Sequence, residues 1–174
     1  MSNIKKTVTT ALLITIGIVL PMAFHSVPSG GLIFLPMHIP VLLCGLICGV
    51  PYGIACGIIT PLLSSLMTGM PPTAILPSML CELAVYGMVA ALLIHFLPIK
   101  NTYVKVYISL TGAMLCGRIV FGVLNALIFR AGEYSMQMWT ATAFVTALPG
   151  IIIQILLIPA VIFALKKARL IEIK

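Results

Sequence analysis

The chain has 174 residues and a net charge of +7; 61% of the residues are hydrophobic, only 7% are charged, and the mean hydropathy is +1.24. A soluble globular domain carries about 25% charged residues, so this composition excludes a soluble fold and indicates a membrane protein. Each crossing needs roughly 20 apolar residues, which allows about six spans and leaves no length for a separate catalytic or nucleotide-binding domain.

Apolar runs separated by glycine, proline and charged residues predict six transmembrane helices. The first run follows Lys5 and Lys6. A cleavable signal peptide is the alternative for this run, although Ala23-Phe24-His25 is a poor cleavage site. We expect residues 1–174 to form a single all-α membrane domain. Its expected spans cover residues 7–24, 35–49, 53–67, 73–97, 103–129 and 140–165.

The second and third expected spans are short and interrupted. Four glycines, Gly45, Gly49, Gly53 and Gly57, recur at every fourth residue across Pro51. Small residues at this spacing let helix backbones touch within a membrane. Short spans broken by glycine and proline are typical of cavity-lining helices in transporters. These two spans are therefore expected to pack closely and to line a ligand cavity.

Basic residues concentrate at one set of span ends. With six spans both termini share a side, and the other side carries only Arg130 between spans. This asymmetry predicts cytoplasmic termini and outward-facing loops at 25–34, 68–72 and 130–139. No basic patch with interleaved aromatic residues exists, so we expect no nucleic-acid partner. The basic residues of the cytoplasmic side are Lys5, Lys6, Lys100, Lys105, Lys166, Lys167, Arg169 and Lys174.

Motifs for membrane-embedded catalysis are missing from the sequence. There is no HExxH, no GxSxG, no aspartate at all and no GxxxxGK[ST] nucleotide motif. Cys44 and Cys48 are one helical turn apart, which differs from the CxxC spacing of zinc and redox sites, and no metal-ligating residue is close to them in sequence. We therefore expect no enzyme activity, no cofactor and no metal site.

Glu82 and Arg118 are the charged residues that fall well inside spans. At 1.5 Å per residue they lie roughly 14 Å and 17 Å from the outer ends of their helices, and therefore at similar depth. Such residues are costly in a membrane and usually face a cavity or each other. The pattern leaves two interpretations open: an ion pair that fixes helix register, or the floor of a polar ligand pocket. Further candidate contacts for a ligand are Tyr86, Asn125, His38 and Gln154, with Trp139 at the expected interface.

The block from Leu35 to Pro72, followed by CELAVYG and CGRIVFG, resembles the substrate-binding S component of energy-coupling factor (ECF) transporters. The resemblance covers nearly the whole chain. It implies a six-helix protein that captures a vitamin or related micronutrient from outside. Such a subunit associates with a transmembrane scaffold protein and two ABC-type ATPases in the cell membrane of a prokaryote, and is thought to topple in the membrane to release its substrate inward.

The resemblance also implies roles for individual segments. Residues Thr7, Ala11 and Thr15, spaced four apart, resemble a small-residue scaffold-docking motif, although the familiar form has two alanines; packing inside the bundle is the other interpretation. Ser29, Gly30 and Gly31 are expected to form a lid in the first loop. The ligand would be bound by this loop and by Glu82, Tyr86, Arg118, Asn125, Gln154 and the 130–139 loop.

The sequence does not identify the substrate. A B6 vitamer would suit a carboxylate, with packing from Tyr86 or Trp139, whereas pantothenate would suit Arg118. The chain has no early run of histidines, so we do not expect a metal ion as its substrate. Two other classes of function stay open: a solitary small-molecule transporter or channel, and a structural membrane subunit that captures no substrate.

Overall fold

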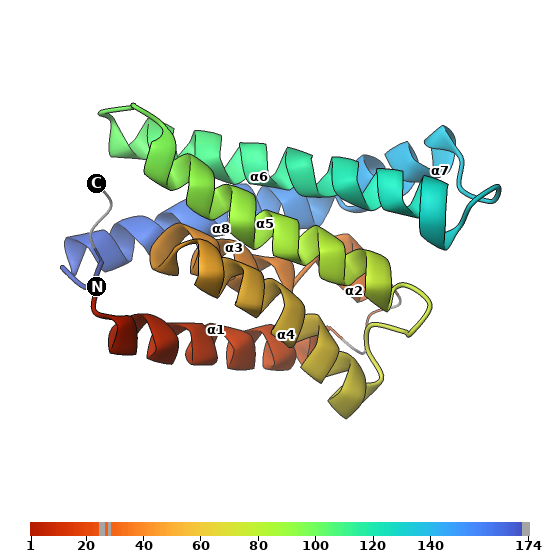
Figure 1. Ribbon diagram of the computed structural model, residues 1–174, viewed down its shortest axis with the longest axis horizontal. Helices are drawn as coiled ribbons and strands as arrows, with labels where there is room; N and C mark the ends of the chain where they lie inside the picture. The colour runs from red at the N-terminus through yellow and green to blue at the C-terminus, as the bar shows by residue number, and fades with distance from the viewer. Residues whose placement is uncertain (25–26, 28, 172–174) are drawn as a thin grey trace.

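The computed structural model describes residues 1–24, 27 and 29–171, and shows an all-helical bundle in that part of the chain (Figure 1). Within these described residues, six helical segments are long and apolar enough to cross a membrane. The elements are α1 (Asn3–Ala23), α2 (Gly30–Phe34), α3 (His38–Cys48), α4 (Val50–Thr68), α5 (Leu76–Phe96), α6 (Thr102–Leu124), the π-helix η1 (Asn125–Phe129), α7 (Met136–Thr140), the π-helix η2 (Ala141–Thr146) and α8 (Leu148–Lys167).

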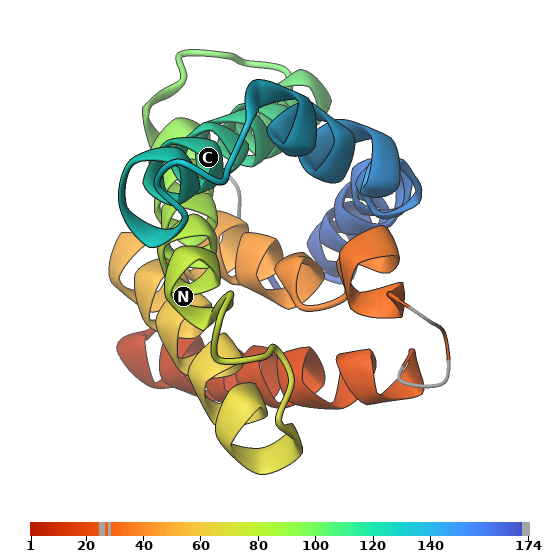
Figure 2. The same cartoon turned by 90° about the vertical axis from the view of Figure 1, so that its right-hand side faces the viewer.

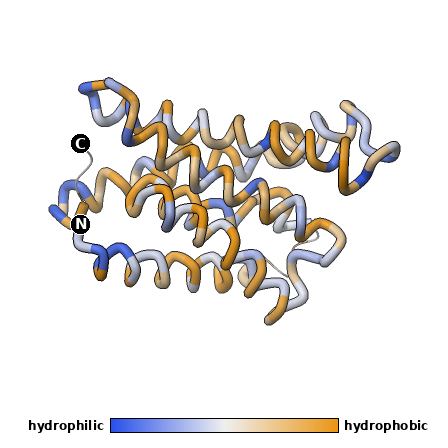
Figure 3. Tube along the Cα trace, viewed as in Figure 1, coloured by the Kyte–Doolittle hydropathy of each residue, from blue (hydrophilic) through white to orange (hydrophobic). Residues whose placement is uncertain are grey.

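The long helices run side by side, so that α1 begins and α8 ends at the same end of the bundle (Figure 1). Lys5 and Lys6 lie in the first turns of α1, and Lys166 and Lys167 in the last turn of α8. Hydropathy along the chain shows polar stretches gathered at this end (Figure 3). We call it the basic end. The connections from α4 to α5 and from η1 to α7 lie at the opposite end, which carries Arg130 and Glu133. Lys174 lies outside the described residues.

The second span begins earlier than the expected residues 35–49, and it is interrupted near its start, as expected from its prolines. Gly30–Phe34, expected in the first loop, form the short helix α2, and α2 with α3 makes one candidate span over Gly30–Cys48. The two helices are separated at Leu35, which adopts a left-handed conformation with φ of 50°. Pro36 explains the break, because proline lacks an amide hydrogen and restricts the residue before it. His25, Ser26 and Pro28 of the expected loop lie outside the described residues.

The sixth span also begins differently from the expectation of a helix over 140–165. The chain becomes helical at Met136, passes through the π-helix η2, and changes direction at Ala147 before α8 begins at Leu148. The end of α6 has the same character, since the Arg130 amide donates to the Asn125 carbonyl oxygen, five residues back, at 2.8 Å. Both π-helices lie toward the end opposite the basic end, and π turns occur frequently at functional sites.

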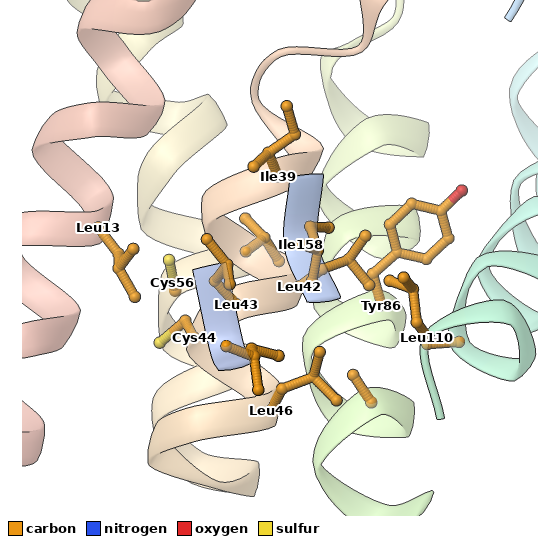
Figure 4. Packing of buried hydrophobic residues seen from close by; sticks show 14 of the residues in the cluster. Leu13, Ile39, Leu42, Leu43, Cys44, Leu46, Cys56, Tyr86, Leu110 and Ile158 are labelled. Atoms are coloured by element: carbon orange, nitrogen blue, oxygen red, sulfur yellow. The ribbon is translucent and has the colours of Figure 1, made fainter. Parts of the chain in front are cut away.

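Helix α3 occupies the middle of the bundle and packs against α1, α4, α5, α6 and α8. Viewed along the bundle, α1 lies on one side of α3 and α6 and α8 lie on the other (Figure 2). The side chains of Val41, Leu42 and Cys44 are completely buried. Figure 4 shows Leu42 between the aromatic ring of Tyr86 on one side and the α1 and α4 side chains on the other. This central position explains why α3 is apolar all round.

Glycines bring α3, α4 and α5 into backbone contact. A Cβ atom on Gly45 or Gly53 would overlap the Gly87 carbonyl oxygen, and one on Gly57 would overlap the Leu83 carbonyl. We call Gly45, Gly53, Gly57 and Gly87 the glycine seam. The helix contact predicted from glycine spacing is confirmed for three of the four glycines named from the sequence. Gly49 has another role: its φ of 96° forms the sharp turn between α3 and α4.

Candidate functional site

The two charged residues within the spans form an ion pair. Glu82 on α5 and Arg118 on α6 place Oε1 and Nη1 3.1 Å apart. Their exposed fractions are only 2% and 7%, so little water screens the pair. The sequence left open an ion pair or the floor of a ligand pocket, and the structure shows the ion pair. Because burying either charge alone is very unfavourable, each residue makes the other tolerable at this depth.

A histidine and a tyrosine adjoin this pair. His38, the first residue of α3, places Nε2 3.8 Å from Glu82 Oε1. Its ring meets the ring of Tyr86 edge-on, with centroids 5.2 Å apart. Both side chains are buried. We call His38, Glu82, Tyr86 and Arg118 the polar cluster; its members come from three helices and were all named as candidates from the sequence.

Local backbone features position the cluster. His38 can start α3 because the chain breaks at Leu35, which turns the histidine toward α5. Tyr86 lies between α5 and α6 because Gly117 has no side chain: a Cβ there would overlap the tyrosine ring. Sequence reasoning did not assign this role to Gly117. The signal for it was present in CGRIVFG, where a glycine directly precedes the arginine.

The other candidates lie around the cluster and bond to backbone. Trp139 Nε1 donates to the Arg118 carbonyl oxygen at 3.0 Å, and its indole ring packs where a side chain on Gly122 would lie. Asn125 Nδ2 donates to the Phe121 carbonyl of its own helix at 2.8 Å. Gln154 Nε2 on α8 donates to the Leu35 carbonyl at 3.5 Å. Trp139 and Gln154 thus brace the backbone next to Arg118 and next to the break before His38.

Several buried polar atoms in this region have no hydrogen-bond partner. They include both ring nitrogens of His38, Nη2 of Arg118 and Oε1 of Gln154; Glu82 Oε1 also has no hydrogen bond, but it is ion-paired with Arg118. A buried donor or acceptor without a partner costs about 1–3 kcal/mol, so proteins seldom keep several close together unless a ligand or water uses them. The set offers both donors and acceptors. Its chemistry therefore suits a small polar organic molecule.

Two cavities adjoin the polar cluster and the expected lid residues. The first, of about 290 Å³, lies between α6 and α8 and has Arg118 as its charged lining residue among Thr111, Met114, Leu115, Phe144, Ile151 and Ile155. The second, of about 340 Å³, lies at the end opposite the basic end. Ser29, Gly30 and Gly31 line it on one side, and Thr68, Met70 and Pro72 line it on the other. The expected lid residues therefore border a cavity, with Gly30 and Gly31 in the first turn of α2.

A family model for the substrate-specific component of ECF transporters matches residues 5–165. The chain belongs to this family. No curated protein matches the chain. Six described helices long and apolar enough to cross a membrane agree with a multi-pass ECF component. The described residues contain no group of three or more His, Cys, Asp or Glu side chains that could hold a metal ion.

The small-residue stripe of this ECF component lies on the outside of the bundle. Thr7, Ala11 and Thr15 are exposed, whereas Leu13 and Gly17 on the opposite face of α1 are buried. The sequence left open whether the stripe packs within the bundle or against another protein. Its exposed position removes the first interpretation and leaves a surface that a second membrane helix could approach closely.

We expect Glu82→Gln to destabilise the ligand-free ECF component, because it leaves Arg118 buried without a counter-charge. Removing one member of a buried ion pair costs about 3–5 kcal/mol. The double variant Glu82→Gln/Arg118→Met should recover part of this loss, since it removes both charges. The measurement is the free energy of unfolding in detergent, followed by circular dichroism.

Glu133→Gln, which changes an exposed carboxylate between η1 and α7, is the matched control and should leave stability unchanged. If the double variant loses as much as the sum of the two single variants, the pair does not couple the two helices.

Proposed function

We propose that this chain is the substrate-capture subunit of an ECF-type importer. It binds a water-soluble vitamin or vitamin precursor from the outer face and delivers it inward with ATPase partners. Membership of the ECF substrate-specific family supports the transport class. The observation that carries substrate capture is the polar cluster, where several buried donors and acceptors have no partner within the protein.

The charges of the cluster limit the substrate. Glu82 and Arg118 neutralise each other, so the site has no strong preference for net charge. An anionic group, as in pantothenate, would bind the second guanidinium nitrogen of Arg118, which has no partner. A basic ring nitrogen or amine, as in a B6 vitamer, would bind Glu82 while Tyr86 or Trp139 packs against the ring. These two ligand types are the leading candidates.

The route of entry is proposed from the outer end of the bundle. Ser29, Gly30 and Gly31 border the cavity at the end opposite the basic end. They are joined through α2 to Leu35, whose carbonyl oxygen accepts a hydrogen bond from Gln154. Movement of this segment would expose the start of α3, where His38 lies. We propose that the segment is the lid of the site.

Partners supply the energy in this proposal. The sequence contains no nucleotide-binding motif, so two ABC-type ATPases would hydrolyse ATP and a transmembrane scaffold would dock on Thr7, Ala11 and Thr15. The basic end would face the cytoplasm of a prokaryotic cell, with both termini there. The protein would be a transport subunit without enzyme activity. A solitary transporter is the alternative, and would bind substrate without binding a scaffold.

Denaturing the purified protein and identifying co-purified small molecules by mass spectrometry should yield one vitamin-like compound. Calorimetry should then give one site per chain, and Glu82→Gln or Arg118→Ala should weaken binding about tenfold or more, because each removes a hydrogen bond to a charged group. Lys5→Gln and Lys100→Gln change exposed charges at the basic end, outside the site, and should bind normally. If no compound in a full vitamin panel binds, the capture role is wrong.

Replacing both Gly30 and Gly31 with proline should slow ligand association and dissociation, because proline stiffens the segment and removes the Gly30 amide that donates to Val27. Stopped-flow binding measures both rates. Gly31→Ala is the control, since a Cβ there meets no atom within 4 Å. Rates unchanged in the proline variant would refute the lid.

Ala11→Trp should abolish assembly with the scaffold while ligand affinity stays unchanged, because a large side chain prevents close approach of a second helix. Co-purification from a membrane that contains the scaffold and ATPases measures assembly. Leu156→Trp, at an exposed position of α8 that lines none of the cavities described, is the control. Normal assembly of the Ala11 variant would place docking elsewhere.

A further inference from the structure

A third cavity lies at the basic end of the bundle, far from the polar cluster along the helices. It measures about 770 Å³ and is bordered by the first turn of α1, the turn between α3 and α4, the last turns of α5 and the first turn of α6. Three of its lining residues are basic: Lys6, His95 and Lys105. None is acidic. Each basic residue comes from a different helix.

The positive field of this cavity is not balanced by acidic residues in the described part of the chain. There the acidic residues are Glu82, in the polar cluster, and Glu133, at the opposite end. Lys105 is only 6% exposed, unlike a lysine that extends freely into water. It has an interaction of its own within the protein, so its charge adds to the field while Lys6 and His95 are the residues offered to a ligand.

The first turn of α4 adds to this field. Val50 and Pro51 line the cavity; Pro51 has no N–H, so Val50 and Tyr52 carry the first backbone N–H groups of α4, and its N-cap Gly49 provides no side chain to accept from them. The amino end of a 19-residue helix carries partial positive charge. Lys6 is held beside it, because its Nζ lies over the ring of Tyr52 in the same turn at 5.8 Å from the centroid. A cation and a helix amino end therefore converge on one side of the cavity.

The remaining walls are apolar and continue onto the exterior of the bundle. Leu46 and Ile47 form the inner wall, and Leu92 and Phe96 lie at the rim. Phe96 is 71% exposed, on a helix that spans the membrane. The cavity thus lies where helices end at the membrane surface, with cationic groups inside and an apolar rim outside. This arrangement fits an amphipathic anion whose hydrocarbon part stays in the bilayer.

We propose that this cavity binds the phosphate headgroup of an anionic phospholipid, with Lys6, His95 and the amino end of α4 around the phosphate and the acyl chains along Leu92 and Phe96. Basic pockets between transmembrane helices are known to take such headgroups. The site goes beyond substrate capture and does not depend on it, since lipid binding can be measured without substrate or partner proteins.

The test uses the purified full chain in a non-ionic detergent with equal amounts of dioleoyl-phosphatidylglycerol and dioleoyl-phosphatidylcholine, which have the same acyl chains. Native mass spectrometry counts each lipid retained. We expect one phosphatidylglycerol to be retained in preference to phosphatidylcholine. Lys6→Gln should lower that retention about fivefold, the effect of one lysine near an anionic lipid surface, and His95→Gln gives a second variant should Lys6→Gln fail to fold.

Lys5→Gln is the matched control, because it makes the same charge change one residue earlier on α1 and does not line the cavity. Equal losses in the Lys5 and Lys6 variants would overturn the site in favour of general surface charge. Inorganic phosphate that protects against thermal unfolding as well as phosphatidylglycerol would overturn it in favour of a soluble anion. Weaker scaffold binding by Lys6→Gln, with no retained phosphatidylglycerol, would overturn it in favour of a protein partner.

Discussion

Backbone contact along the glycine seam is the constraint on which the rest of the bundle depends. At Gly45, Gly53 and Gly87, helices α3, α4 and α5 approach so closely that no Cβ fits between them. In a membrane, where apolar side chains gain nothing by leaving lipid, such close approach is a main source of helix association. The seam fixes α5 relative to α3, and therefore fixes Glu82 and Tyr86 relative to His38.

The polar cluster is completed by α6, which lies on the side of α5 away from α4 (Figure 2). Helix α6 brings Arg118 to Glu82, and Gly117 lets the Tyr86 ring lie against α6 without a gap. Helix α8 packs against α2, α3 and α6 but has no seam of its own with α5. The side of the site that faces α8 is accordingly where a cavity lies, lined by Arg118. The protein thus pairs a closely packed half with a looser half, and the polar cluster lies at their junction.

The sequence predicted how deep the charged residues lie in the spans and which glycines, Gly49 apart, lie at helix contacts. It predicted less well where helices begin and where they bend. Hydropathy and the helical rise placed Glu82 and Arg118 at similar depth, and the structure pairs them. Glycine spacing indicated close helix contact. Helix α2 was not foreseen, because a Ser-Gly-Gly sequence favours a loop until tertiary contacts hold it. The π-helices left no signal, since their extra residue depends on how the helix ends pack.

Side-chain partners were the hardest feature to predict. Gln154 and Asn125 were named as ligand contacts from type and position alone, yet their amide nitrogens donate to backbone carbonyls. A polar side chain within a helix can bond to its own backbone, to a neighbour or to a ligand, and spacing does not distinguish these. The effect of proline was more predictable, because it acts through the backbone, as at Leu35 before Pro36. Gly49, expected in a helix contact, instead forms the turn between α3 and α4.

The position of Trp139 gives the protein an optical reporter. It is the chain's one tryptophan, its indole N–H is bonded to the Arg118 carbonyl oxygen, and its ring lies edge-on to Phe144. Phe144 and Arg118 both line the cavity between α6 and α8. Indole emission changes with the polarity of its surroundings, so the intrinsic fluorescence of the unlabelled protein reads out a single place beside the ion pair. Occupancy of that region can therefore be followed in detergent or vesicles without attaching a dye.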